Sequence, residues 1–246
     1  MIGRVRRSRT VTDALPTELA LHDGIAYSLW LPASGQAARG GVLILHGAGS
    51  RKESHHDFAR AVRAAGLAAL AFDQRGHGAT PGPLDGRVLE DTVSMAQLLR
   101  EKLGYSGAPL ALRGSSMGGY LAIVAAAPAG ASAVVAICPA GASGLRRALK
   151  RGGLRFEADA PALDALLAAH DLPAAVATLE QPLLLLHAEG DEQVPVAQSR
   201  ELAQHFAHPL SRLIALPGGH HRSIQHDSEL QAVSLRFIER TFGVHA

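Results

Sequence analysis

Six short apolar runs, separated by stretches with helical periodicity, limit most tightly what this chain can fold into. The runs cover residues 42–45, 67–72, 110–112, 134–137, 183–186 and 213–216. None alternates polar with apolar residues, so each is typical of a strand buried on both faces. This alternation predicts an α/β protein with a mostly parallel, doubly wound sheet and functional residues at the carboxyl ends of its strands.

Amphipathic patterns fill the gaps between these runs. One covers residues 58–65 and follows Ser54, which has capping-box spacing to Asp57. Two others cover residues 89–103 and 230–237, and Asp227 precedes the second as a predicted cap.

Two segments depart from the alternation. Residues 17–21 and 25–31 flank His22-Asp23-Gly24, which predicts an antiparallel hairpin. Residues 140–180 contain no strand run, only an Ala/Leu-rich helical pattern, and we expect them to form a small helical lid over the strand ends. The basic residues of this lid are Arg146, Arg147, Lys150, Arg151 and Arg155. Without repeats or low-complexity linkers, the sequence predicts a single domain over residues 1–246.

Composition excludes several other classes of protein. Of the 246 residues 47% are hydrophobic, and the formal net charge is only +2, which excludes a disordered chain. The positive charge is concentrated in Arg4, Arg6, Arg7 and Arg9, within a segment at 1–9 that we expect to be a flexible tail. Since the remainder is not basic, we expect no nucleic-acid partner.

The uncharged stretch 114–145 is long enough to span a bilayer. Pro128 and Pro139 interrupt it, so we expect two buried elements in succession and no membrane partner. The single cysteine, Cys138, excludes an internal disulfide and leaves too few thiols for a structural zinc site. We therefore expect a reducing, cytoplasmic compartment.

The segment Gly114-Ser115-Ser116-Met117-Gly118 lies between a predicted strand and an Ala-rich helical pattern. This is G-x-S-x-G in the strand–turn–helix setting that presents a nucleophilic serine on a sharp elbow. Glycines on either side let such a turn close. Ser116 is the candidate nucleophile, and the Met117 N–H is a candidate oxyanion donor.

Two further loops carry a family resemblance. His46-Gly47-Ala48-Gly49 follows the first apolar run, and Asp73-Gln74-Arg75-Gly76-His77-Gly78 follows the second. With the serine elbow, these loops resemble the α/β-hydrolase superfamily over nearly the whole chain from about Ile25, and they are also similar to prolyl-oligopeptidase-type hydrolase domains. The resemblance implies that Ala48 supplies the second oxyanion-hole N–H. A dinucleotide-binding fold is set aside because Lys52 stands where its third glycine belongs.

In this superfamily the nucleophile is followed along the chain by the acid and then by the histidine, so we expect the acid and the base in later loops. Asp191 follows the run at 183–186 in a loop ending in Val194-Pro195, and it matches the family's acid position. Glu189 and Glu192 are its rivals in the same loop. The loop after the preceding strand, where some members place the acid, begins with Cys138 and contains no carboxylate, which favours Asp191.

The candidate base lies after the last run, in Pro217-Gly218-Gly219-His220-His221-Arg222. The family framings P-G-x-x-H and G-x-x-H-R both place the histidine at His221. His220 remains the alternative base.

Other polar residues have weaker claims. His55-His56-Asp57, with His77 or His226, could be imagined as a metal site, but the spacing fits no metal-binding motif, and we expect neither metal nor cofactor. Arg51 and Lys52 follow the Ala48 turn and are candidates for substrate contact as much as for a surface role.

The resemblance implies a serine hydrolase that cleaves small to medium carboxylic esters through an acyl-enzyme, with a small-molecule ester as its partner. A peptidase or amidase and a thioesterase are alternatives on the same triad. A non-catalytic binding protein of the same fold is the alternative of another class, and a homodimer is left open.

Overall fold

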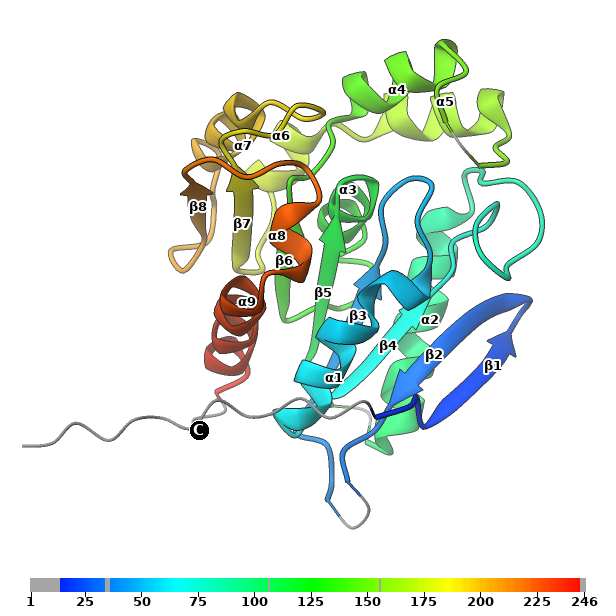
Figure 1. Cartoon of the computed structure of the whole chain (residues 1–246), viewed down its shortest axis with the longest axis vertical. Coiled ribbons are helices and arrows are strands. Elements are labelled where there is room, and N and C mark those ends of the chain that lie inside the picture. The colour runs from blue at the N-terminus through cyan, green and yellow to red at the C-terminus, as the bar shows by residue number, and fades with distance from the viewer. Residues whose placement is uncertain (1–13, 34–35, 106, 155, 244–246) are drawn as a thin grey trace, which may run out of the picture.

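The computed structural model of the chain describes residues 14–33, 36–105, 107–154 and 156–243, so the expected tail at 1–9 and Arg155 lie outside the described residues. Over that part of the chain, eight strands form one sheet in the order β1-β2-β4-β3-β5-β6-β7-β8 (Figure 1). They are β1 (Glu18–His22), β2 (Ile25–Trp30), β3 (Gly41–Leu45), β4 (Ala68–Phe72), β5 (Leu110–Ser115), β6 (Ala133–Ile137), β7 (Leu183–Ala188) and β8 (Arg212–Leu216). β2 pairs antiparallel with β1 and β4, and every other pair is parallel. The predicted α/β architecture is confirmed.

Helices cover both faces of this sheet, as the apolar runs predict. They are the 3-10 helix η1 (Lys52–His55), α1 (His56–Ala64), α2 (Val88–Leu103), α3 (Met117–Val124), α4 (Ala142–Lys150), α5 (Ala160–Ala169), α6 (Leu172–Ala177), α7 (Val196–Ala203), α8 (Ser223–His226) and α9 (Ser228–Thr241). In β3, Val42 and Ile44 pack in the cluster formed with α1 and α9, whereas Leu43 and Leu45 pack in the cluster formed with α2 and α3. A strand between two apolar layers needs apolar side chains at consecutive positions.

Local sequence signals correctly predict the hairpin and one of the two helix caps. β1 and β2 are joined through Asp23 (φ 49°) and Gly24 (φ 80°), the two positive φ angles of a tight hairpin turn. Asp227 caps α9 by accepting from the Glu229 and Leu230 N–H groups, as predicted. The predicted capping box of α1 is wrong, because Ser54 already lies within η1.

A long-range contact explains that error. The Lys52 N–H, at the start of η1, donates to the Asp73 carboxylate at 2.7 Å. The helical path therefore begins two residues before Ser54, at a point fixed by a side chain from the loop after β4. His55 becomes the N-cap residue of α1 and makes no side-chain cap bond.

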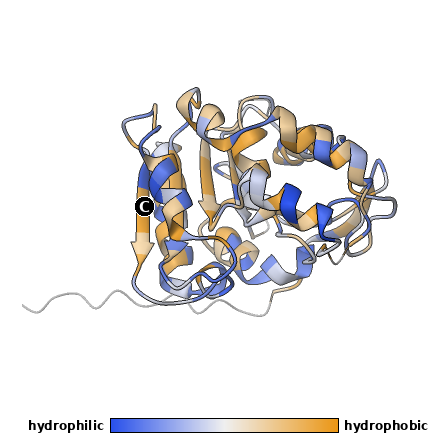
Figure 2. Ribbon diagram, turned by 90° about the horizontal axis from the view of Figure 1, so that it is seen from above, coloured by the Kyte–Doolittle hydropathy of each residue, from blue (hydrophilic) through white to orange (hydrophobic). Residues whose placement is uncertain are grey.

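Three helices, α4, α5 and α6, lie between β6 and β7, in the region 140–180 where the sequence predicts a helical insertion. Figure 1 shows α4 and α5 beyond the carboxyl ends of the parallel strands. Seen from that side, α4 has strongly hydrophilic turns next to the mostly hydrophobic α5 (Figure 2). Two backbone hydrogen bonds join residues 157–159 to Leu84 at 2.9 Å each, which fixes this segment to the loop before α2.

The uncharged stretch 114–145 forms the end of β5, α3, β6 and the start of α4, so it contains buried elements in succession. Among the helices of the described residues, none has both the length and the apolar character needed to cross a membrane.

Candidate active site

The turn between β5 and α3 holds Ser116 in an uncommon backbone conformation. Its φ of 53° and ψ of −118° lie outside the regions that non-glycine residues prefer, at a cost of about 1–3 kcal/mol. Neighbouring strands and loops hold it there: the Ser116 N–H donates to the Ile137 carbonyl at 2.9 Å, and its own carbonyl accepts from Ala140 at 3.1 Å. The serine therefore stands at the carboxyl edge of the sheet on a rigid, strained turn.

Glycine is required on both sides of this serine. A Cβ on Gly114 would lie 2.0 Å from the Gly118 carbonyl oxygen, and a Cβ on Gly118 would lie 2.3 Å from the Leu45 carbonyl oxygen. These neighbours are backbone atoms, so a side chain could be accommodated only if the turn itself moved. The two glycines of G-x-S-x-G thus allow α3 to pack directly against the end of β3.

The turn after β3 lies against the serine. A Cβ on Gly47 would be 3.2 Å from the Ser115 carbonyl oxygen and 3.3 Å from the Ser116 Cβ. Ala48 follows this close approach and lines the same cavities as Ser116. Met117 is the first residue of α3, where helix N–H groups lack intrahelical acceptors. The backbone of both candidate oxyanion donors therefore borders the serine.

The loop after β4 holds the Ala48 turn in place. The Asp73 carboxylate accepts from the Lys52 N–H and from the Lys52 ammonium, both at 2.7 Å. His77 Nδ1 donates to the Arg75 carbonyl, which leaves Nε2 to accept from the Gly49 N–H at 3.0 Å. The D-x-R-G-x-G turn is thus a scaffold for the oxyanion turn, a role that the sequence analysis did not assign.

Asp73 and Lys52 stabilise each other's charged form in this scaffold. Burial raises the pKa of the Asp73 carboxyl, but the Ala79 N–H and the Lys52 ammonium outweigh burial and hold that pKa below its ordinary value. Burial alone would lower the pKa of Lys52, but its hydrogen bonds to Asp73 and Glu53 outweigh burial and hold that pKa above its ordinary value. Both groups remain charged at neutral pH.

The ion pair with Asp73 bears on whether Lys52 contacts the substrate. The Lys52 side chain is 8% exposed, and among the described residues it is absent from the lining of both large cavities by Ser116. The Lys52 ammonium therefore bonds to Asp73 behind the turn and does not line these cavities. Arg51 lines one of these cavities and is exposed.

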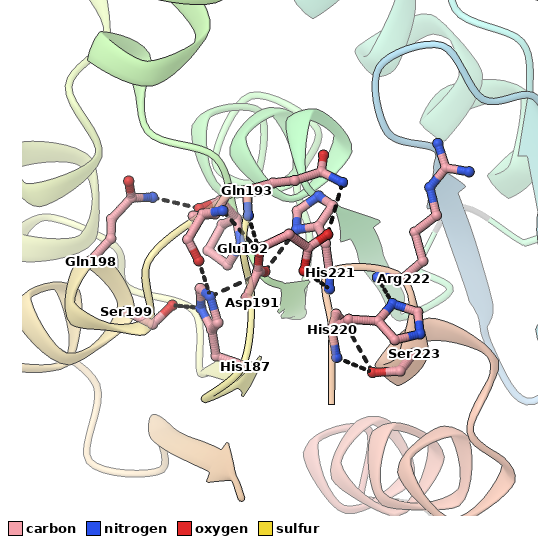
Figure 3. A network of polar contacts seen from close by, with 12 residues as sticks. His187, Asp191, Glu192, Gln193, Gln198, Ser199, His220, His221, Arg222 and Ser223 are labelled. Atoms are coloured by element: carbon pink, nitrogen blue, oxygen red, sulfur yellow. Dashed lines mark hydrogen bonds and ion pairs between the residues drawn. The ribbon is translucent and has the colours of Figure 1, made fainter. Parts of the chain in front are cut away.

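The loop after β7 brings Asp191 to His221 (Figure 3). Asp191 Oδ1 accepts from the N–H groups of Gln193 and Val194 at 2.9 and 2.8 Å. Asp191 Oδ2 then lies 2.7 Å from His221 Nδ1, with the carboxylate fully buried. Burial raises the pKa of Asp191, but the Val194 N–H and the His221 imidazole hold it below its ordinary value. The ionised carboxylate fixes Nδ1–H on His221 and leaves Nε2 free to accept a proton.

The rival carboxylates have other partners. Glu189 forms an ion pair with Arg200, and Glu192 accepts from the His221 backbone N–H at 3.4 Å. His187, which the sequence analysis did not single out, stands behind Asp191, with Nε2 3.4 Å from Oδ2 and Nδ1 2.7 Å from the Ser199 hydroxyl. Burial lowers the pKa of His187, which keeps this imidazole neutral behind the acid.

The tandem histidines point in different directions. His221 lines both cavities together with Ser116, whereas His220 is exposed and accepts at Nδ1 from the Arg222 N–H at 3.3 Å. The positive φ angles of Gly218 and Gly219, 69° and 73°, shape this loop. Of the two histidines, only His221 is brought to Ser116 and Asp191.

Cys138 completes the surroundings of the acid. It is buried at the end of β6, and burial raises the pKa of its thiol to about 12, so the thiol stays protonated and donates to Asp191.

In the part of the chain that the structure describes, Cys138, Asp191 and His221 form the only group of three potential metal ligands, with their atoms within 4.8 Å of one another. The acid is already engaged by His221 and the thiol is protonated, so this trio is poorly suited to a cation. Among the described residues, the imagined site at His55–Asp57 does not bring three ligand atoms together: His226 binds Asp57, whereas His56 binds Ser28.

Two cavities meet at Ser116 and His221. One, of about 570 Å³, extends toward His77, Phe156 and α8. The other, of about 860 Å³, extends beneath α4. These volumes suit a small organic molecule.

Comparison with known proteins adds independent information. The family model described as serine aminopeptidase, S33, matches residues 36–159. No curated protein matches the sequence.

Solved structures similar to this chain include a monoacylglycerol lipase from Paleococcus ferrophilus, at 19% identity and a TM-score of 0.69 over 89% of this chain and 98% of the lipase. A soluble variant of monoglyceride lipase from Saccharomyces cerevisiae is 16% identical, with a TM-score of 0.74 over 94% of this chain and 96% of that one. Est1E from Butyrivibrio proteoclasticus, with bound ferulic acid, is 20% identical, with a TM-score of 0.67 over 94% and 98%. At these identities the likeness concerns the fold.

Proposed function

The chain belongs to the serine hydrolase family described as serine aminopeptidase, S33, and has the α/β-hydrolase fold, and from this premise we propose that it cleaves carboxylic esters of small to medium size. The observation that carries the proposal is the 2.7 Å contact of Asp191 Oδ2 with His221 Nδ1, together with the placement of His221 and Ser116 in the same two cavities.

In the proposed mechanism, the Ser116 hydroxyl attacks the ester carbonyl and His221 Nε2 takes its proton. The buried Asp191 carboxylate stabilises the imidazolium that forms. The N–H groups of Ala48 and Met117 donate to the oxyanion of the tetrahedral intermediate. His221 then returns the proton to the leaving alcohol, which leaves Ser116 acylated, and water activated by the same histidine releases the acid.

Hydrolysis of peptides is the second candidate, because the family description names an aminopeptidase. An aminopeptidase must bind the positively charged amino terminus of its substrate, normally with a carboxylate. Among the described residues that line the two cavities, none is Asp or Glu. This lining favours an ester over a peptide, as do the names of two structural neighbours, a monoacylglycerol lipase and a monoglyceride lipase.

The test compares 4-nitrophenyl butyrate with an amino-acid 4-nitroanilide. We expect turnover of the ester by the wild type, and a loss of about 10⁴-fold or more in kcat for Ser116→Ala and for His221→Ala. His220→Ala is the matched control, and we expect it to retain activity.

Other results would replace the proposal. Faster cleavage of the nitroanilide would favour the peptidase, and preference for a matched thioester would favour the thioesterase. A folded wild type without turnover of any of these substrates would favour a non-catalytic binding protein. A cytoplasmic location remains a proposal that rests on the single cysteine.

A further inference from the structure

Three arginines from two separate segments line the larger cavity beside Ser116. Arg147 lies on the last turn of α4, Arg151 is the C-cap residue of the same helix, and Arg222 follows His221 in the loop after β8. All three are exposed, so their guanidinium groups are accessible to a molecule in the cavity. Together they place positive charge in the cavity that Ser116 also lines.

None of these three arginines has a carboxylate partner among the described residues. The adjacent Arg146, by contrast, forms a two-pronged pair with Asp164 at 2.7 and 3.0 Å. Arg75 forms a similar pair with Asp91 at 2.8 and 2.9 Å. Figure 3 shows the Arg222 side chain extended, with no contact drawn to its guanidinium group.

Neither of the nearby acids, Asp191 and Glu192, forms an ion pair with these arginines. Asp191 is fully buried and bound to His221, and Glu192 binds the His221 backbone. Among the described residues lining the cavity, none is acidic. Arg147 and Arg151 are four residues apart, so they lie on one side of α4 and repel each other in the absence of an anion.

A guanidinium group recognises carboxylate and phosphate through paired N–H donors. Such a group on a substrate would relieve the repulsion and be drawn toward the site by its field. We propose that the natural ester carries an anionic group, a carboxylate or a phosphate, which Arg147, Arg151 and Arg222 bind in the cavity beneath α4 while the ester carbonyl reaches Ser116. This inference rests on the proposed ester hydrolysis.

The experiment uses two matched pairs of esters on the full chain. 4-Nitrophenyl hydrogen succinate and 4-nitrophenyl butyrate differ by a carboxylate on the acyl side. 1-Butyrylglycerol 3-phosphate and 1-butyrylglycerol, followed by pH-stat titration, differ by a phosphate on the alcohol side. For at least one pair we expect kcat/KM to favour the charged ester by about 100-fold, since each of the three exposed arginines contributes roughly a factor of five to binding the anion. The pair that shows the preference identifies the anion.

The site is then tested by substitution. In the double variant Arg147→Gln/Arg151→Gln, we expect the preference for the charged ester to fall to about fivefold, the contribution of the remaining Arg222 by the same estimate. Lys150→Gln is the matched control, because it removes one positive charge from the same helical turn at a residue outside the cavity lining. We expect this control to keep the preference.

Three results would overturn the inference, and they can be told apart. Equal or better hydrolysis of both neutral esters, dependent on Ser116, would reject the anion site and leave the proposed function standing. An equal loss of preference in Lys150→Gln would assign the effect to overall charge. Absence of turnover with all four esters would reject the proposed function and this inference with it.

Discussion

The ion pair between Lys52 and Asp73 allows a quantitative test of the scaffold behind the oxyanion turn. The Lys52 Nζ lies 2.7 Å from Asp73 Oδ2, and the two side chains are 8% and 0% exposed. At this separation, with an effective dielectric constant of about 20, their attraction is about 6 kcal/mol before the cost of desolvation is subtracted. Breaking such a pair from one side costs about 3–5 kcal/mol, because the other charge remains buried.

We expect Lys52→Met to lower the free energy of unfolding by about 3 kcal/mol, the lower end of that range. The reason is that Asp73 keeps two donors, the N–H groups of residue 52 and of Ala79. Urea denaturation at pH 7, followed by circular dichroism, measures the loss. Lys150→Met, an exposed lysine on α4, is the matched control, and we expect it to change stability by less than about 0.5 kcal/mol.

The pH dependence provides a second check on the same pair. The pKa of Asp73 is below its ordinary value in the folded state, so its contribution to stability is present above the unfolded value of 3.8 and is lost as pH falls through the folded value. The stability difference between wild type and Lys52→Met should therefore narrow in acid. A loss below about 1 kcal/mol at pH 7, or a double variant Lys52→Met/Asp73→Asn no more stable than Lys52→Met alone, would refute the reasoning.

Four further predictions follow from individual contacts. Gly118→Ala should lower kcat by about 100-fold or more, because its Cβ would lie 2.3 Å from the Leu45 carbonyl oxygen and displace the serine turn; steady-state kinetics on a folded variant checks this. Asp191→Asn should lower kcat by about 10⁴-fold with little change in melting temperature, and retained activity would assign the acid elsewhere. Cys138, with its pKa raised to about 12 by burial, should not react with Ellman's reagent at pH 8 until the protein is unfolded. Burial lowers the pKa of His46 to about 4. The unfolded chain therefore binds a proton at His46 at higher pH than the folded chain does, and the free energy of unfolding should fall by about 3 kcal/mol as pH falls from 6.5 to 4. Urea denaturation at several pH values measures this loss, with His46→Gln as the comparison.

The features that could be predicted from the sequence depend on local chemistry. Continuous apolar runs identify strands between two helical layers, and β3, with Val42 and Leu43 buried on opposite faces, shows why. G-x-S-x-G identifies the turn at Ser116 because both glycines meet backbone atoms. Asp227 as a helix cap needs only the next three residues.

The features that the sequence analysis missed depend on residues far apart in the chain. Asp73 and Lys52 are 21 positions apart, and no local pattern reveals that the Asp73 carboxylate accepts from the Lys52 N–H at the start of η1 and from the buried Lys52 ammonium. His77 supports Gly49 across 28 positions in the same way. His187 directly follows an apolar run, at the strand end where functional residues were expected, but its packing behind Asp191 depends on the loop that folds back over it.

The choice between His220 and His221 also shows this limit. Both family framings place the base at His221, but a second histidine beside it on a Gly-rich loop leaves His220 as an alternative. Their directions are determined by the contacts of the folded loop: His220 turns outward to accept from the Arg222 N–H, and Asp191 binds its neighbour His221.

The most direct test of the proposed triad is labelling with a fluorophosphonate, followed by intact-mass measurement and peptide mapping. An activated serine reacts with this probe whatever the natural substrate is. We predict a single adduct on Ser116 in the wild type and in His220→Ala, and none in His221→Ala. An adduct that persists in His221→Ala and is lost in His220→Ala, or the absence of any adduct on Ser116 in the folded wild type, would contradict the assignment of Ser116, His221 and Asp191 as the catalytic residues.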